Sequence, residues 1–253
     1  MLESHIKDKL KQKDILLMTH IVLGYPSFDA SFEIVKQMVE AGVDLMELQI
    51  PFSEPIADGP VILKANQEAL KKGATVAECM DFAAKVSETF DIPFLFMTYY
   101  NILYKYGVAR FAEEMTKRGV MGAIVPDLPP EEAEEYLAAM KKESRSPIFI
   151  FAPTTTDERM NYIAEYGSGF IYCVARKGVT GQDTNFSNKL ENYLKRCREA
   201  TSLPLALGFG VKDRDDIDYL RGKADIAVIG TQTIRIVEES GPEAVGPFIK
   251  GLR

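Results

Sequence analysis

The chain has 253 residues, a net charge of −7, two histidines and three cysteines. The acidic balance argues against a nucleic-acid-binding protein, because phosphate backbones are held mainly by Lys and Arg. Two histidines are too few for an ordinary histidine-based metal site, so we expect no metal. The cysteines form no C-x-x-C pair and are expected to be buried thiols in a reducing cytoplasm. We expect neither a signal peptide nor a membrane span, since no suitable apolar run is present.

Eight short apolar runs alternate with helical patterns along the whole chain. The runs cover residues 15–22, 43–50, 93–100, 122–127, 147–153, 169–175, 203–210 and 224–230. Amphipathic stretches between them include 32–42, 76–90 and 131–142. Continuous apolar runs flanked by helices are typical of parallel strands buried on both faces. An open doubly wound sheet also alternates in this way, but eight β-then-α units favour an α/β protein with a closed (β/α)8 TIM barrel.

We expect this barrel to form one catalytic domain over residues 1–253, with an extra helix at the N-terminus. That helix carries Leu2, Ile6 and Leu10 at a spacing of four residues. One apolar stripe of this kind predicts that the helix closes the bottom of the barrel.

The second apolar run contains a carboxylate on a predicted interior face. Strand alternation places Val43, Leu45, Glu47 and Gln49 on one face, which points into the barrel. The alternate residues, beginning at Asp44, form the other face and are largely apolar. A buried carboxyl group is costly unless it is paired or functional, and burial favours its protonated form. Such a group suits acid–base catalysis, although a structural carboxylate satisfied by hydrogen bonds is the alternative.

The segment PFSEPIADGP, residues 51–60, follows that strand. Its three prolines forbid a regular helix and predict a long, partly rigid loop over the strand ends, where barrel enzymes place their sites. Asp58 lies in this loop just before Gly59 and Pro60. By local chemistry Asp58 is either a catalytic carboxylate or the cap of the next helix.

The last two strands end in glycines that suit a phosphate group. One run ends at Gly210, and the next ends at Gly230 and Thr231, where a helical pattern begins. Glycine lets the backbone approach a ligand, and helix N-termini attract phosphate. In the loop 175–185, Thr180 and Gly181 are either a further anion contact or part of a mobile lid. Tyr99 and Tyr172 fall at strand ends, where a packing role is as reasonable as a substrate contact.

Several motifs then resemble one family. They are ELQIPFSEPIADGP (47–60), LGYPS (23–27), TYYN (98–101), PDLP (126–129), APTT (152–155), GVTG (178–181) and GFG (208–210). In this order, over essentially the whole chain, they resemble the α subunits of tryptophan synthase. The resemblance implies a lyase of tryptophan biosynthesis that cleaves indole-3-glycerol phosphate to indole and glyceraldehyde 3-phosphate.

The resemblance also implies residue roles. Glu47 matches the catalytic acid/base, and Asp58 matches the carboxylate that meets the indole N–H. The substrate-binding positions implied are His20, Tyr99, Tyr172, Thr180, Gly181, Gly210, Gly230 and Thr231. The chain departs from the family pattern at several of its positions, with Gln49 for Gly, Glu54 for Asp, His20 for an aromatic residue such as Phe, and Thr231 for Ser. Gln49 is expected either to hold the Glu47 carboxylate or to crowd the substrate.

The family further implies no cofactor in this chain and a β subunit partner that carries pyridoxal phosphate, in an α2β2 assembly. We expect that partner to accelerate a slow isolated chain. Three alternatives stay open at this point: a different phosphate-binding barrel enzyme, a free-standing lyase that releases indole, and a weakly catalytic subunit that mainly activates its partner.

Overall fold

The computed structural model describes residues 1–175, 183–208 and 210–253, and the side chains of residues 1–175, 189–208 and 210–253. Eight parallel strands form a closed barrel in chain order, and β8 pairs with β1. The strands are β1 (Leu16–Val22), β2 (Leu45–Gln49), β3 (Phe94–Met97), β4 (Gly122–Ile124), β5 (Ser146–Phe151), β6 (Ile171–Val174), β7 (Leu205–Gly208) and β8 (Ile226–Ile229). Each strand lies within one of the eight predicted apolar runs or begins one residue before it, so the closed-barrel prediction is confirmed.

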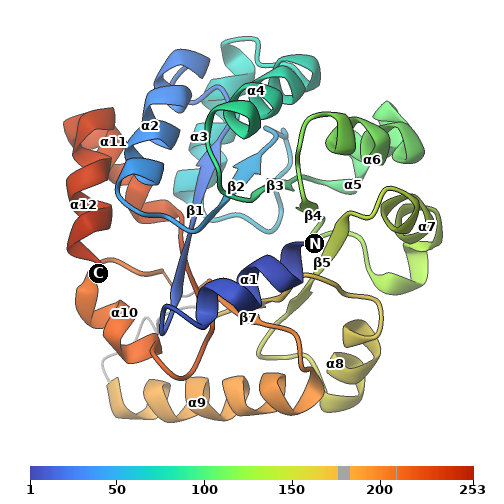
Figure 1. Ribbon diagram of the computed structural model, residues 1–253, viewed down its shortest axis with the longest axis vertical. Helices are drawn as coiled ribbons and strands as arrows, with labels where there is room; N and C mark the ends of the chain where they lie inside the picture. Colours follow the sequence, from blue (N-terminus) through green and yellow to red (C-terminus); the bar gives the residue numbers. More distant parts are fainter. Residues whose placement is uncertain (176–182, 209) are drawn as a thin grey trace.

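Helices surround this barrel (Figure 1). They are α1 (Leu2–Leu10), α2 (Phe28–Glu40), α3 (Pro60–Lys71), α4 (Val76–Thr89), α5 (Tyr100–Tyr106), α6 (Val108–Lys117), η1 (Pro130–Glu132), α7 (Glu134–Lys142), α8 (Asp157–Ala164), α9 (Asp183–Ala200), α10 (Arg214–Leu220), α11 (Thr231–Ser240), η2 (Pro242–Ala244) and α12 (Val245–Gly251). The predicted helical stretches correspond to α2, α4 and α7. Within the described residues, no helix has the length and apolar character needed to cross a membrane.

Several helices begin at a residue whose side chain caps the first turn. Ser27, Thr156 and Asp213 each accept a hydrogen bond from a backbone N–H three residues later. Thr75 forms a reciprocal capping box with Glu78 at the start of α4. These side chains satisfy N–H groups that the helix itself leaves unpaired, which fixes where the chain turns from loop to helix.

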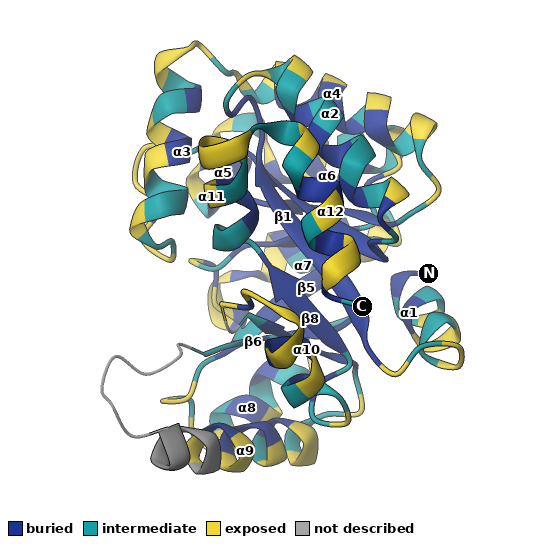
Figure 2. Cartoon of the chain, turned by 90° about the vertical axis from the view of Figure 1, so that its left-hand side faces the viewer, coloured by how far each residue is buried: buried dark blue, intermediate teal, exposed yellow. Residues whose placement is uncertain are grey.

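The N-terminal helix closes one end of the barrel, as predicted. Leu2 and Ile6 of α1 are fully buried and belong to the same cluster as the interior side chains Leu16 and Met18. Leu10 is partly buried against that cluster. Figure 2 places α1 beside the strand ends on the right of the view. The opposite end of the barrel, at the C-terminal ends of the strands, is therefore the end left for a site.

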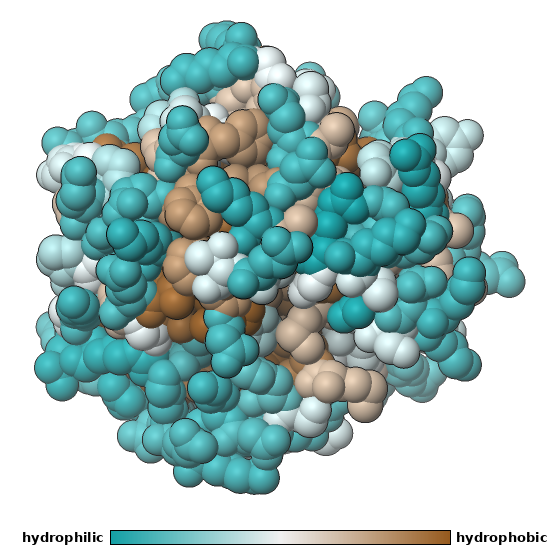
Figure 3. All heavy atoms as spheres, turned by 45° about the horizontal axis from the view of Figure 1, so that its top comes forward, coloured by the Kyte–Doolittle hydropathy of each residue, from teal (hydrophilic) through white to brown (hydrophobic). Residues whose placement is uncertain are grey.

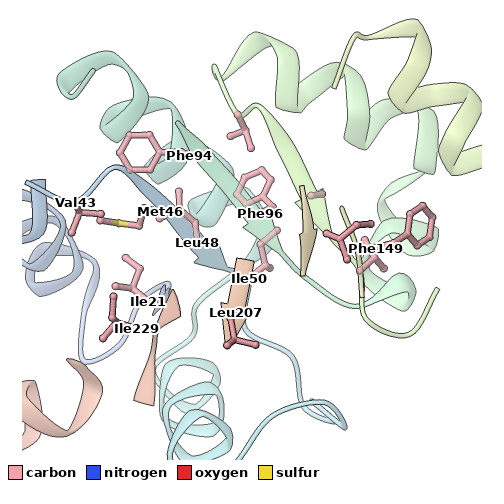
Figure 4. Packing of buried hydrophobic residues seen from close by; sticks show 14 of the residues in the cluster. Ile21, Val43, Met46, Leu48, Ile50, Phe94, Phe96, Phe149, Leu207 and Ile229 are labelled. Atoms are coloured by element: carbon pink, nitrogen blue, oxygen red, sulfur yellow. The ribbon is translucent and has the colours of Figure 1, made fainter. Parts of the chain in front are cut away.

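A second apolar layer lies between the strands and the surrounding helices. Met46 and Leu48 of β2 point outward into this layer, as does Ile50 just after the strand, and Phe94 packs there too (Figure 4). Val43 also belongs to this outer cluster, so its predicted inward position was wrong. The regular alternation begins only at Leu45, the first residue of β2, and does not extend back to Val43. The helices turn mostly hydrophilic residues outward on the side seen in Figure 3.

Asp44 connects separate segments of the chain at the bottom of the barrel. Its carboxylate is buried and accepts hydrogen bonds from the backbone N–H of Leu17 at 2.9 Å and from Arg253 Nη2 at 2.6 Å. Lys13 Nζ forms an ion pair with the other carboxylate oxygen. One buried charge thus joins the segment before β1, the start of β2 and the C-terminal residue.

Candidate active site

A cavity of about 560 Å³ opens at the end of the barrel where the strands terminate. Every strand contributes to its lining: His20 (β1), Glu47 (β2), Met97 (β3), Ile124 (β4), Ile150 (β5), Tyr172 (β6), Gly208 (β7) and Val228 (β8). The walls combine apolar side chains with a few polar groups, as is usual for small-molecule sites. The position agrees with the rule that barrel enzymes use the C-terminal ends of their strands.

Glu47 occupies the interior face of β2, as the strand alternation predicted. Its side chain is 2% exposed. Oε2 lies 3.1 Å from Nδ1 of His20, whereas Oε1 is buried and has no hydrogen-bond partner among the described residues. A buried acceptor without a partner is costly, so Oε1 is placed to bind a group that enters the cavity.

His20 lies directly beside Glu47, because the two residues are register partners in the β1–β2 pair. Burial by itself lowers the pKa of this imidazole. The hydrogen bond and charge of Glu47, with a smaller effect of the Asp58 charge, outweigh burial and raise the pKa of His20 above its ordinary value. Nε2 of His20 is buried and has no hydrogen-bond partner in the part of the chain that the structure describes.

Asp58 is held over the cavity by two neutral donors. Gln49 Nε2 donates to its Oδ2 at 2.6 Å, and the hydroxyl of Tyr99 donates to the same oxygen at 3.1 Å. Burial raises the pKa of Asp58, although the His20 charge and these two donors oppose the rise. The capping alternative was wrong, since α3 begins after Gly59 without a side-chain cap. Residues 51–59 contain no helix, as the prolines predicted, and the last of the three prolines, Pro60, begins α3.

Gln49 therefore holds Asp58, the second carboxylate of the site. The expectation that it would hold Glu47 was wrong, because its amide Nε2 donates to Asp58 instead. That it crowds the substrate stays a prediction. Tyr99 also accepts a hydrogen bond from the backbone N–H of Ala57 at 3.1 Å, and its ring stacks on Phe52 with centroids 5.2 Å apart. Tyr99 does not line the cavity and instead anchors the loop that carries Asp58.

Tyr172 faces the cavity from β6. Burial, together with the nearby Glu47 and Asp58 charges, raises the pKa of its hydroxyl well above the usual value, so Tyr172 stays neutral. A Cβ placed on Gly208 would come within 3.0 Å of the Tyr172 ring. The glycine in β7 therefore makes room for the tyrosine.

The rim of the cavity near β7 and β8 is rich in backbone N–H groups and carries positive charge. Gly210, Gly230 and Thr231 line it, with Gly230 at the N-cap of α11, and Gly210 has a φ of +82° that favours glycine. Lys212 and Arg235 line the same cavity and were not identified from the sequence. The spacing of four residues between Thr231 and Arg235, one helical turn, was the available signal.

The structure thus brings His20, Glu47, Asp58, Tyr172, Gly210, Gly230 and Thr231 around one cavity, with Tyr99 behind Asp58. The two remaining predicted positions, Thr180 and Gly181, lie outside the described residues. No cluster of His, Cys, Asp or Glu suited to a metal ion occurs within the residues described.

Comparisons with known proteins agree on one family. The family model described as tryptophan synthase alpha chain matches residues 6–246. The tryptophan synthase alpha chain of Syntrophotalea carbinolica is 68% identical over 253 residues, and that of Desulforapulum autotrophicum is 62% identical over 252 residues, each alignment covering 100% of both chains. Tryptophan synthase from M. tuberculosis in its aminoacrylate-bound form superposes with a TM-score of 0.90 at 28% identity, over 100% of this chain and 99% of that chain. This chain belongs to the tryptophan synthase alpha chain family.

Proposed function

We propose that Glu47 and Asp58 catalyse the cleavage of indole-3-glycerol phosphate to indole and glyceraldehyde 3-phosphate, the alpha reaction of tryptophan synthase. One observation carries this assignment. A buried carboxylate, Glu47, and a half-buried one, Asp58, line the same cavity, and each is held by a different set of partners. Different environments allow two carboxylates to perform different tasks in one reaction.

The reaction needs two proton movements and one broken bond. The indole ring gains a proton at C3, the hydroxyl on the neighbouring side-chain carbon loses one, and the bond between these carbons breaks. The electron pair of that bond returns to the indole while the hydroxyl becomes an aldehyde. Glu47, with its free Oε1, accepts and delivers the proton. Asp58 stabilises the positive charge that develops on the indole nitrogen.

The phosphate group binds at the opposite rim of the cavity. Gly210, Gly230 and Thr231 offer backbone N–H groups there, and Lys212 and Arg235 add positive charge. Barrel enzymes commonly bind phosphate beyond strands seven and eight at the N-terminus of a helix. Crystals soaked in sulfate should contain the anion at this rim. An anion bound only near α1 would contradict the assignment.

No cofactor is required in this chain, and pyridoxal phosphate belongs to the β subunit of tryptophan synthase. That β subunit is the partner, in an α2β2 assembly. Its docking surface includes the loop 51–60 and α5, since Ile56 is 82% exposed and Tyr104 is 65% exposed. The two segments adjoin, because Ala57 is hydrogen-bonded to Tyr99, the residue that precedes α5. Large exposed apolar side chains mark protein interfaces.

Docking at this surface links the partner to catalysis. A β subunit that contacts Ile56 orders the loop that carries Asp58, only two residues away. It thereby shifts the chain toward the catalytically competent arrangement. Cleavage rates with and without the β subunit of the same organism test this link. If the isolated chain is already fast and the β subunit changes nothing, the protein is a free-standing lyase that releases indole.

The whole chain, residues 1–253, acts as one catalytic domain, and we place it in the cytoplasm. The state of its thiols supports this location. Cys79, Cys173 and Cys197 are all buried and free. Structural disulfides are typical of oxidising compartments and rare in the cytosol.

A Glu47→Gln variant tests the catalytic assignment most directly. Glutamine keeps the size and hydrogen-bonding shape of the side chain but cannot take up the proton. We expect the cleavage rate to fall by roughly 10²–10⁴-fold, the usual contribution of a general acid–base group. Glu54→Gln, in the exposed part of the loop 51–60, is the matched control for the isolated chain and should keep the wild-type rate. A Glu47→Gln rate close to wild type would contradict the proposal.

A further inference from the structure

The imidazole of His20 makes a specific contact with the proposed acid–base residue. Nδ1 of His20 and Oε2 of Glu47 are 3.1 Å apart, and the two side chains are only 5% and 2% exposed. The β1–β2 register places the residues side by side on neighbouring strands. The contact is therefore built into the barrel wall and does not depend on a flexible loop.

The contact makes the two oxygens of the Glu47 carboxylate different from each other. Oε2 is held by His20, whereas Oε1 is buried without a partner among the described residues and belongs to a side chain that lines the cavity. A carboxylate fixed at one oxygen cannot rotate freely about its last torsion, so the other oxygen keeps a constant direction. Fixed geometry of this kind is what an efficient proton transfer requires.

We propose that His20 is a positioning residue for Glu47, donating from Nδ1 to Oε2 so that Oε1 is presented to the substrate. This inference rests on the proposed role of Glu47. His20 takes no part in bond making or breaking, and its effect on the reaction passes through the carboxylate. The pair converts a single acid–base residue into a histidine–glutamate dyad that spans β1 and β2.

The surroundings of His20 predict how the dyad responds to pH. Glu47 from β2, Asp58 from the loop 51–60 and Tyr172 from β6 are the titratable groups near it, with Lys212 and Arg235 at the far rim. The neighbouring residues Gly230 and Thr233 carry no charge.

The raised pKa of His20 keeps the imidazole cationic as the pH rises through the ordinary histidine range near 6.5. Below that range His20 is fully protonated, and its positive charge complements Glu47. This charge is lost as the pH rises through the raised value of His20, so we expect the alkaline decline of activity to report this titration.

Two substitutions separate the hydrogen bond from the charge. His20→Asn places an amide donor near the position of Nδ1 but cannot titrate. His20→Phe keeps an aromatic ring and removes the donor. We expect His20→Phe to lower kcat at least tenfold with a small change in KM, since hydrogen bonds to charged groups contribute roughly 1.5–3 kcal/mol. His20→Asn should retain most of the rate and lose the alkaline limb of the pH profile.

The only other histidine, His5, provides the control. It lies on α1 at the closed end of the barrel, and burial, followed by the Lys9 charge, lowers its pKa. With two histidines in the chain, their ring signals can be followed separately by NMR. We expect His20 to titrate above pH 6.5 in the wild type and at a lower pH in Glu47→Gln, while His5 does not change. His5→Asn should keep the wild-type pH profile.

The outcomes distinguish this inference from the proposed function. If Glu47→Gln is inactive but His20→Phe keeps both the wild-type rate and the wild-type pH profile, the positioning role is refuted and the role of Glu47 stands. If Glu47→Gln cleaves at the wild-type rate, the proposed function itself fails. Should either His20 variant fail to fold, the NMR titration of His20 in wild type and Glu47→Gln still decides, and an unchanged titration overturns the dyad.

Discussion

Tyr99→Phe tests whether catalysis depends on the anchoring of Asp58. The substitution removes one hydroxyl, which donates to Asp58 Oδ2 and accepts from the N–H of Ala57, both at 3.1 Å. The phenyl ring keeps its stack on Phe52. Because Tyr99 is fully buried, water does not readily replace the hydroxyl, and both partners lose a hydrogen bond.

The magnitude of the Tyr99→Phe effect follows from the charged hydrogen bond. Loss of a hydrogen bond to a carboxylate is worth about 1.5–3 kcal/mol. At about 1.4 kcal/mol per factor of ten, kcat/KM should fall roughly 10- to 100-fold if the whole effect reaches the transition state. Steady-state cleavage of indole-3-glycerol phosphate by the isolated chain measures it. Tyr106→Phe, at the other end of α5, is the control. An unchanged kcat/KM for Tyr99→Phe would refute the anchoring role.

Three further changes test other parts of the structure. Asp44→Ala should lower the free energy of unfolding in urea by on the order of 2–3 kcal/mol, because it leaves buried donors unpaired, whereas Asp8→Ala in an exposed ion pair should change it little. Gln49→Met removes a donor that lowers the pKa of Asp58, so the acid limb of kcat/KM should move to higher pH, and a shift to lower pH would contradict this sign. Ile56→Asp should weaken β subunit binding at least about tenfold by titration, as expected for an interface hot spot, and equal affinity would exclude Ile56 from the interface.

Local sequence patterns predicted the barrel and the inward face of β2. Strand alternation is a property of a few neighbouring residues, so Glu47 could be assigned to the interior without any knowledge of its neighbours. Similarly, the prolines were enough to exclude a helix from residues 51–59, whereas Pro60 is the first residue of α3. The error at Val43 arose because alternation was extended two residues before the strand begins.

The contacts between elements could not be predicted in this way. The pairing of His20 with Glu47 depends on the stagger between β1 and β2, which closure of the whole barrel determines. The hydrogen bond from Gln49 to Asp58 depends on how far the proline-rich loop folds back over the strand ends. Residues that are nine positions apart in sequence thus become partners because of the course of this loop, which no periodic sequence pattern predicts.

The partners of the two carboxylates give each a distinct task. Glu47 is held at Oε2 by His20, and its Oε1 has no hydrogen-bond partner among the described residues, which suits a group that must exchange a proton with the substrate. Asp58 receives two neutral donors on one oxygen, and these, together with the His20 charge, oppose the effect of burial on its pKa. Donors of this kind stabilise the ionised form, which is the form able to stabilise a developing positive charge. Exchanging the partners of the two carboxylates would therefore exchange their tasks, so the donors on β1, on β2 and just before α5 determine the chemistry as much as the carboxylates do.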